Sequence, residues 1–271
     1  MQAAQLEAPP RSRRALATAW RDAGVPTLAT VIAFGVWEAA CRLFDVPSYL
    51  LPLPSEIWTD TIEIGGTVAM HTLATLKTVF LGFLVSIVIS LPLAVALTTS
   101  PATAASVYPF LVWTQSIPKV ALAPILVVIL GANELPRVVI TFLVAFFPLV
   151  ISVATGLMSV PSELIELGRA CRASKWSELV RIRLPYAVPF IFAGLKVAIT
   201  LAVVGAVVAE FVNADSGLGF LIQTSTAFFK VPVAFGALII LSLMGVILFQ
   251  AVVVIERVFF PWSSANSTSI L

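Results

Sequence analysis

The sequence predicts an all-α protein that is integral to a membrane, with about six transmembrane helices. Of its 271 residues, 59% are hydrophobic and only 11% are Asp, Glu, Lys or Arg. An ordinary soluble domain carries roughly 25% charged residues. The mean hydropathy of +1.04 points the same way, since a water-facing surface on this scale would need far more charge. A length of this size alone would allow one or two domains.

Composition also argues against several classes of function. The formal net charge of +2 is too small to indicate nucleic-acid binding. Cys41 and Cys171 fall within or beside apolar segments without metal-ligand spacing, and His71 is the single histidine. A zinc site, a disulfide framework and a histidine-based hydrolase are therefore not expected, and no cofactor is expected on this chain.

The spans follow from the thickness of a bilayer core, about 30 Å, which about 20 apolar residues cross as a helix. Six segments have this length and character. They run over Pro26–Phe44, Thr78–Thr98, Val107–Leu130, Pro136–Gly156, Val188–Glu210 and Ala234–Ile255.

The placement of basic residues predicts that both termini are cytoplasmic. Lys and Arg gather in short cytoplasmic loops, and an inside amino terminus puts most of the 16 Lys and Arg residues, Lys196 included, on that side. The expected organisation is a cytoplasmic tail over 1–25, a transmembrane domain over 26–260 and a tail over 261–271. The first span exceeds a signal-peptide core of about 7 to 15 residues. It also holds Glu38 and Arg42 four residues apart, most simply a structural pair, so we expect it to be retained.

The outer loop after the first span predicts a short interfacial helix over Glu56–Ile64. Pro-rich chain leads into Ser55, which we expect to cap this helix, with Glu56 in its first turn. Trp58 suits a position at the level of the lipid headgroups.

The loop over 157–187 carries the most specific signal. Pro161 and Ser162 are typical of a helix start, and apolar and charged residues then alternate as on an amphipathic helix. A second short helix is expected after the cap Ser174, ending at Pro185. Its members divide into one face with Trp176, Leu179 and Val180 and another with Lys175, Glu178 and Arg181. The loop is thus expected to form two short amphipathic helices with a bend at Ala173 and Ser174, presented to the cytoplasm. In the alternative interpretation, the loop only lies on anionic lipid headgroups, which attract its basic residues.

The stretch Glu166–Pro185, ELGRACRASKWSELVRIRLP, resembles the cytoplasmic signature of bacterial ABC importer permeases: Glu-Ala-Ala, three residues, Gly, nine residues, Ile-x-Leu-Pro. Glu166, Ile182, Leu184 and Pro185 match in register. Leu167 and Gly168 replace the paired alanines, and Arg172 replaces the glycine. The last change bears on the bend, because glycine adopts backbone conformations that other residues avoid.

The resemblance extends from Val46 to Trp262 and includes LPLPSEIW, TQSIPKVALAPILV, VVGAVVAEFVNADSGLGFLI and ERVFFPW. These segments are similar to the nitrate, sulfonate and taurine branch, especially to permeases for thiamine-precursor pyrimidines and related small organic solutes. The resemblance implies a type I importer permease in the cell inner membrane. It also implies a homodimer of this subunit, two ABC ATPase subunits and a periplasmic or extracellular substrate-binding protein.

ATP and Mg would belong to the ATPase partner, because no G-x-x-x-x-G-K-[ST] loop occurs in this chain. The loop over 157–187 would then couple ATPase closure to the membrane helices. The resemblance assigns this coupling role to Glu163, Glu166, Arg172, Ala173, Ser174, Lys175, Trp176, Ile182, Leu184 and Pro185.

Polar groups at membrane depth are the candidates for the translocation pathway, because such groups are costly in lipid and usually face a bundle interior or a wet cavity. They are Gln115, Ser116, Lys119, Glu210 and Asn213. Lys119 would suit an anionic solute, although it could instead reach toward an interface or pair with Glu210. The turn over 214–219 is either a gate or binding-protein contact or a plain loop with glycines.

Three alternatives remain at this point. Ala202, Gly205, Ala206 and Ala209 form a small-residue stripe that serves either packing within the subunit or a dimer seam. An ATP-independent secondary transporter or channel would often show internal repeats and paired ionisable groups, and no convincing repeat is present. A membrane-embedded enzyme would need clustered reactive side chains, which the spans lack.

Overall fold

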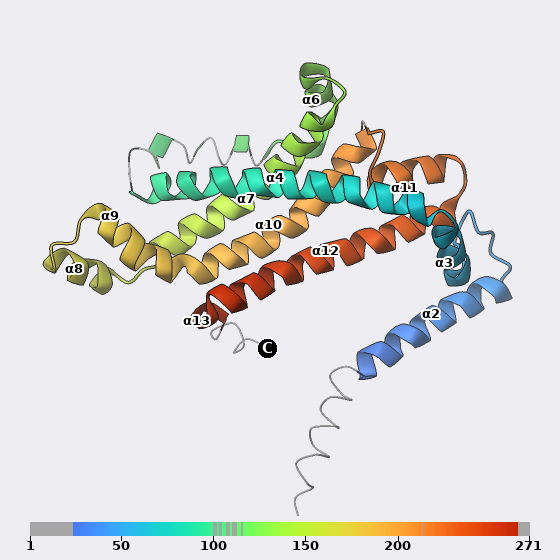
Figure 1. Cartoon of the computed structure of the whole chain (residues 1–271), viewed down its shortest axis with the longest axis horizontal. Coiled ribbons are helices and arrows are strands. Elements are labelled where there is room, and N and C mark those ends of the chain that lie inside the picture. The colour runs from blue at the N-terminus through green and yellow to red at the C-terminus, as the bar shows by residue number, and fades with distance from the viewer. Residues whose placement is uncertain are drawn as a thin grey trace, which may run out of the picture.

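The computed structural model describes residues 24–99, 102, 105, 106, 109, 113, 114, 116–212 and 214–264 (Figure 1). Every regular element within these residues is helical, which agrees with the predicted all-α class. The elements are α2 (Val25–Leu43), α3 (Pro54–Glu63), α4 (Gly65–Thr99), η2 (Lys119–Leu122), α6 (Ala123–Leu130), α7 (Glu134–Met158), α8 (Ser162–Ala170), α9 (Lys175–Glu178), η3 (Leu179–Arg183), α10 (Leu184–Val212), α11 (Leu218–Ala227), α12 (Val231–Phe259) and α13 (Pro261–Ser264).

Four helices in the described ranges are long and apolar enough to cross a membrane. They are Gly65–Thr98, Glu134–Met158, Lys175–Val212 and Val231–Phe259. With 35 residues, α4 is about 52 Å long at about 1.5 Å per residue, so it extends well beyond a bilayer core. All four helices begin before the spans predicted from the sequence, and three of them also end later; the predicted end at Thr98 is confirmed.

The other two predicted spans do not correspond to long apolar helices in the described part of the chain. The first coincides with α2, whose 19 residues include Glu38 and Arg42 and which is not among the four. The third lies partly outside the described residues, and its described carboxy-terminal part, Lys119–Leu130, is a short apolar helix. The structure therefore supports four of the six predicted spans, and the total of six stays a prediction.

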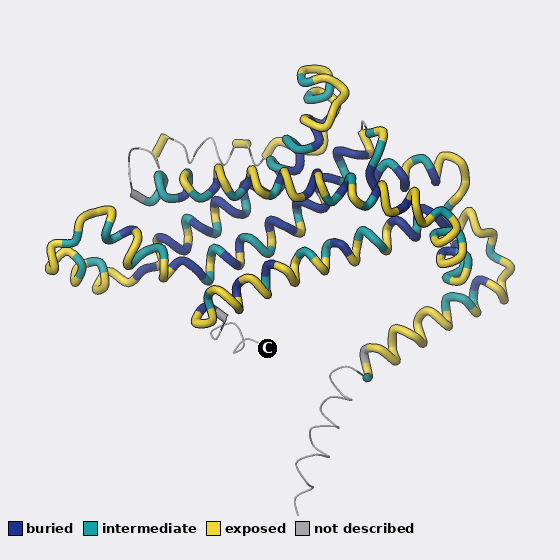
Figure 2. Tube along the Cα trace, in the orientation of Figure 1, coloured by how far each residue is buried: buried dark blue, intermediate teal, exposed yellow. Residues whose placement is uncertain are grey.

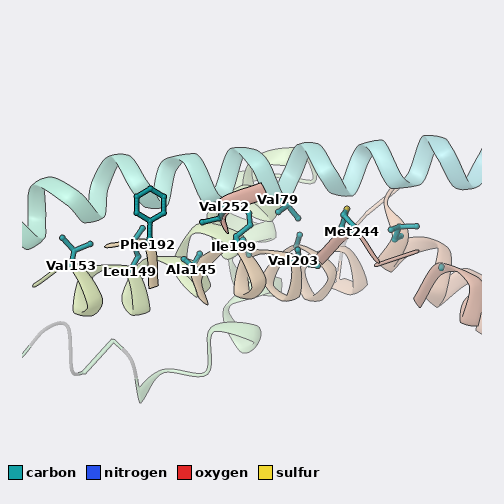
Figure 3. Close-up of a cluster of buried hydrophobic side chains, with 14 of the residues drawn as sticks. Val79, Ala145, Leu149, Val153, Phe192, Ile199, Val203, Met244 and Val252 are labelled. Carbon is teal, nitrogen blue, oxygen red and sulfur yellow. The ribbon is translucent and has the colours of Figure 1, made fainter. Parts of the chain in front are cut away.

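The core lies between α4, α7 and α10. The helices α7 and α10 pack against each other along their length, and α4 lies against α7 (Figures 1 and 3). Val79, Leu149, Phe192 and Ile199 belong to the buried apolar cluster that joins them. Glycine permits the close approach, because a Cβ at Gly194 would lie 2.6 Å from the Cβ of Ser152.

The small-residue stripe of α10 packs within the subunit. Ala202 and Ala206 are fully buried and Ala209 is 2% exposed. A Cβ at Gly205 would lie 3.1 Å from the Cα of Thr141 in α7. Of the two alternatives for this stripe, packing between α10 and α7 is the one the structure supports.

In contrast, α2 and α12 expose long apolar faces (Figure 2). Such faces are expected to contact lipid or other protein in a membrane. The predicted pair is present, since Arg42 Nη2 lies 2.6 Å from Glu38 Oε1. The expected cap at Ser55 is wrong: Leu53 precedes the first turn of α3, and the Ser55 hydroxyl donates to Glu38.

Pro185 does not end the second loop helix, contrary to the prediction. The helical path is continuous from Lys175 to Val212. A proline ring clashes with the carbonyl four residues earlier in a regular α-helix, which here is Arg181. That residue lies in a π-turn, η3, where the Leu184 N–H donates to the Leu179 carbonyl, and the wider turn accommodates the ring.

Lys196 lies inside α10 rather than in a loop. Its Nζ forms an ion pair of 2.6 Å with Glu256 Oε2 of α12, and the Ser263 hydroxyl donates to the other oxygen of Glu256. A lysine paired in this way gives no evidence of sidedness. The cytoplasmic assignment of Lys196 stays a prediction.

Candidate functional site

The bend between α8 and α9 is built around Arg172. The Ala173 N–H donates to the Gly168 carbonyl, and the Arg172 N–H donates to the Arg169 carbonyl. This pair of bonds closes a helix in the manner that usually requires glycine at the residue in the left-handed conformation. Arg172 adopts that conformation itself, with φ of 56°. The substitution of the family glycine therefore leaves a glycine-like backbone, and the bend predicted at Ala173 and Ser174 is present.

The second helix begins as predicted, because Ser174 Oγ accepts from the Ser177 N–H at 3.2 Å. The predicted faces of this helix are wrong, however. Leu179 is 5% exposed and belongs to the core, whereas Trp176 is 73% exposed. Val180, expected on the same face, is also exposed. The wide π-turn after Glu178 shifts successive side chains away from the regular α-helical pattern.

Glu178 turns inward and holds the loop to the bundle. Its Oε1 accepts from Nε and Nη2 of Arg183 at 2.8 and 2.7 Å. The Nη1 of Arg183 donates to the Leu157 carbonyl at the end of α7. Close packing adds to this, because a Cβ at Gly168 would lie 2.8 Å from the Cδ1 of Ile182. The backbone of the loop is thus fixed by contacts to both membrane helices that carry it.

The outward side of the same loop carries exposed apolar side chains among charged ones. Leu164 is 41% exposed, Leu167 61% and Trp176 73%. Glu163, Glu166, Arg172, Ser174 and Lys175 are exposed around them, Pro185 is exposed on α10, and Ala173, Ile182 and Leu184 are partly buried. A fixed backbone with an exposed apolar anchor and charges beside it can bind another protein in a defined register.

The opposite end of the bundle, where α7 begins and α10 ends, is closed by a buried polar cluster around Glu210. Glu210 has no exposed surface. Its Oε1 accepts from the Thr75 hydroxyl at 2.8 Å, and its Oε2 accepts from the Gly219 N–H at 2.7 Å. The predicted pathway residue Glu210 thus organises the turn that leads into α11 in this conformation.

The first amides of α11 receive side-chain acceptors from α4. The Gly217 N–H donates to His71 Nδ1 at 3.0 Å, and the Leu218 N–H donates to the Thr75 hydroxyl at 2.7 Å. The amides at a helix amino terminus have no partner in the helix itself, so these contacts satisfy them. Gly217 has φ of 121°, and a Cβ there would clash with the Glu210 carboxylate. The glycines of this turn are required by close approach.

Sequence reasoning missed the partners of Glu210. His71 and Thr75 stand four residues apart on α4 and therefore share one helix face, but nothing in the pattern of the sequence paired that face with a turn more than 130 residues later. Arg137 is the second omission. It is 7% exposed, and its Nη1 donates to the Ser216 carbonyl at 3.1 Å.

Lys119, a predicted pathway residue of the third span, is not paired with Glu210. Lys119 lies in η2 with its Nζ 4.8 Å from the centre of the Phe147 ring, a cation–π contact rather than the ion pair with Glu210 that was considered. Ser116 is exposed. Gln115 and Asn213 lie outside the described residues. The pathway role of these residues stays a prediction.

The fold and the two ends of the bundle define a class of protein. Apolar membrane helices are joined by a rigid loop with an exposed apolar anchor. No group of three or more His, Cys, Asp or Glu side chains that could hold a metal ion occurs among the described residues. These features are typical of a polytopic transport subunit that works with protein partners.

Comparison with known proteins identifies the family. Residues 82–262 match the model of the binding-protein-dependent transport system inner membrane component. The formylaminopyrimidine transport permease of Halalkalibacterium halodurans is 34% identical over 88% of this chain and 95% of its own length. The riboflavin transport permease of Chloroflexus aurantiacus is 33% identical over 94% of this chain and 96% of its own. The chain belongs to this family of ABC importer permeases, as its signature predicted.

More distant relatives agree with the predicted branch. The taurine transport permease of Escherichia coli is 24% identical over 88% of each chain. A solved methionine ABC transporter in an inward-facing conformation shares the fold, with a TM-score of 0.62 and 23% identity over 69% of this chain and 93% of that one. The protein is therefore a transport subunit rather than an enzyme, and the ATPase is a separate partner.

Proposed function

We propose that this chain forms the translocation pathway of an ATP-driven importer for a small organic solute. In this proposal two copies assemble in the cell inner membrane with two ATPase subunits, and a binding protein outside the membrane delivers the solute. Each copy has six spans with both termini in the cytoplasm. Membership of the binding-protein-dependent permease family supports the proposal.

The observation that carries it is the construction of the loop between α7 and α10. The loop projects from one end of the bundle, where α8 and α9 lie away from α11 and α3 (Figure 1). Its inner side is fixed by Leu179 and by Arg183 with Glu178, whereas Leu167 and Trp176 are exposed. We assign this outward side to the ATPase contact.

The class of solute rests on relatives of this chain. Those relatives are named as permeases for formylaminopyrimidine, riboflavin, aliphatic sulfonates and taurine. All are small organic compounds, and the set includes both anionic and neutral ones. We therefore propose a sulfonate, a taurine-like compound or a pyrimidine of the thiamine-precursor type.

The competing function is an ATP-independent secondary transporter or channel. That reading leaves the exposed side of α8 and α9 without a partner. Uptake into proteoliposomes that contain the permease, its ATPase and a loaded binding protein separates the two functions. Uptake that proceeds at the full rate without ATP would refute the importer assignment.

Two variants test the ATPase contact. Trp176→Ala should reduce co-purification of the ATPase and uptake, because it removes the largest exposed anchor. Glu166→Lys should do the same by reversing an exposed charge on the same loop. The matched control is Trp58→Ala in α3 at the far end of the bundle, where the tryptophan is 70% exposed. Wild-type recovery of the ATPase by both loop variants would remove the assignment.

The role of Lys119 has its own test. If its ammonium group attracts the solute, Lys119→Met should slow uptake of an anionic solute and spare that of a neutral one. The cation–π contact with Phe147 would be lost in both cases. Equal rates for the two kinds of solute would eliminate an electrostatic role.

A further inference from the structure

Arg137 is a buried cation whose donors are incompletely used. Its side chain is 9% exposed. The Nη1 donates to the Ser216 carbonyl, but the Nε is buried without a hydrogen-bond partner in the structure. A guanidinium group stays protonated in proteins and has five N–H donors in a fixed fork. A buried charge with an unused donor is costly unless a ligand or partner completes it.

The nearest carboxylates do not complete it. Asp215 Oδ1 lies 3.6 Å from Arg137 Nη2, and the Asp215 side chain is 90% exposed. Glu210 is close enough to interact electrostatically with Arg137, but its oxygens are occupied by Thr75 and Gly219. Glu134, at the start of α7, is paired with Lys77 at 2.7 Å. The pair with Asp215 is thus long and faces solvent, and such pairs contribute little.

Arg137 borders a small cavity at this end of the bundle. The cavity has a volume of about 200 Å³ and is lined by Ala132, Asn133, Arg137, Ala214 and Asp215. It lies between the start of α7 and the turn after α10, so it is at the end of the bundle away from α8 and α9. Its size suits one acidic group of a small molecule.

We propose that this cavity is a binding site for a small oxyanion, a carboxylate, sulfonate or phosphate group, with Arg137 as its principal ligand. Guanidinium forks match the geometry of oxyanions and form charge-assisted hydrogen bonds with them. Asp215 competes with the ligand for the guanidinium and moves aside into solvent when the ligand binds. The oxyanion comes either from the acid group of an organic solute or from a free inorganic anion.

Asp215 is ionised near neutral pH and therefore competes, as a weak ion pair, for the guanidinium of Arg137. Its own backbone amide and the Ser216 hydroxyl donate hydrogen bonds to the carboxylate, and with the charge of Arg137 they lower the pKa of Asp215. Asp215→Asn removes this negative charge while it keeps the size of the side chain. The variant should bind an oxyanion more tightly than the wild type, whereas a merely structural pair would predict no gain.

The test measures the thermal midpoint of the full chain in lipid nanodiscs at constant ionic strength. The probes are sodium methanesulfonate, sodium phosphate and the neutral isostere methanesulfonamide. Methanesulfonate or phosphate should raise the midpoint in the wild type. The half-saturating concentration should fall about threefold in Asp215→Asn, the effect of removing a weak competing ion pair. Arg137→Gln should abolish the response, and Arg42→Gln, a change at an exposed arginine, should leave it unchanged.

Each outcome decides the proposal. A response to sulfonate alone identifies the acid group of an organic solute as the ligand, and a response to phosphate alone identifies a free inorganic anion. Equal shifts with methanesulfonamide, or no response in both the wild type and Asp215→Asn, would overturn it. The comparison of Asp215→Asn with the wild type tests the proposal even if Arg137→Gln does not fold. The site belongs to this chain alone, so its failure would not affect the importer assignment.

Discussion

The two ends of the helix bundle differ in whether their side chains find partners within the chain. At the α11 end, formed by His71, Thr75, Glu210 and the turn over 214–219, buried polar atoms contact one another. At the α8–α9 end, the inner side is packed but Leu167 and Trp176 remain exposed. Except for Arg137 Nε, the α11 end is therefore complete within one chain, whereas the α8–α9 end leaves exposed the apolar side chains that we assign to a partner. Substitutions at the α11 end and on the inner side of the α8–α9 end should lower the free energy of unfolding. Substitutions on the outer side of the α8–α9 end should instead weaken association with a partner.

The largest loss of stability is expected for Gly217→Ala. The new Cβ would clash with the buried Glu210 carboxylate, and φ of 121° is unfavourable for alanine. Strain and overpacking together should lower the free energy of unfolding by about 4 kcal/mol. Chemical unfolding of the purified chain in micelles measures it. The control is Gly245→Ala, where a Cβ meets no atom within 4 Å; equal losses at both glycines would contradict the clash.

Two neighbouring residues of the loop separate its inner and outer sides. Leu179→Ala should lower the free energy of unfolding by about 3 kcal/mol, because it leaves a cavity in the core. Trp176→Ala should change it by less than about 0.5 kcal/mol, because its side chain is exposed. The same unfolding assay compares them. A large loss for Trp176→Ala in the isolated chain would show that the outer side is not available to a partner.

Thr75→Val tests the α11 end without a change in side-chain shape. It removes the hydroxyl that donates to Glu210 and accepts from the Leu218 N–H. Two buried groups lose a partner, so the free energy of unfolding should fall by about 2 kcal/mol. Thr72→Val is the control, since that hydroxyl bonds only the Val68 carbonyl of its own helix. A difference of less than about 0.5 kcal/mol between the variants would exclude the tertiary cap.

The smallest effect concerns the bend and has a distinctive sign. Arg172→Gly should raise the free energy of unfolding by about 1 kcal/mol, because glycine adopts φ of 56° without strain. Arg169→Gly, in the last turn of α8, should lower it by about 1 kcal/mol, because glycine weakens a helical position and the ion pair of Arg169 with Glu178 is lost. Unfolding midpoints of the two variants should move in opposite directions. A shift in the same direction would mean that the left-handed conformation of Arg172 costs nothing.

Much of the fold could be predicted because lipid imposes simple rules on sequence. Runs of about 20 apolar residues indicate spans, and four of the six predicted spans correspond to long helices. The first is the helix α2, which is shorter and carries Glu38 and Arg42. The ends of the spans could not be predicted, since α4 begins at Gly65, well before the apolar run. Helices continue through polar residues wherever packing favours them.

The α8–α9 end was predictable in outline because its signature is local. The bend, the cap at Ser174 and the match of Glu166 to Pro185 all lie within one short stretch of chain. The faces of the second helix were not predictable. The π-turn that carries Leu179 inward and lets the helix pass Pro185 packs against α7 and α8, so it depends on tertiary contacts.

By itself, the sequence determined the membrane class, the family signature and the loop that bears it, because composition and short-range spacing encode these properties. Only the tertiary structure decided which polar residues meet. It brought His71 and Thr75 of α4 to the first amides of α11, buried Glu210 against Gly219, and left Arg137 with an unused donor beside a cavity. His71 and Thr75 lie more than 140 residues from the amides that they contact, and the packing of α4 against α10 and α11 makes them neighbours.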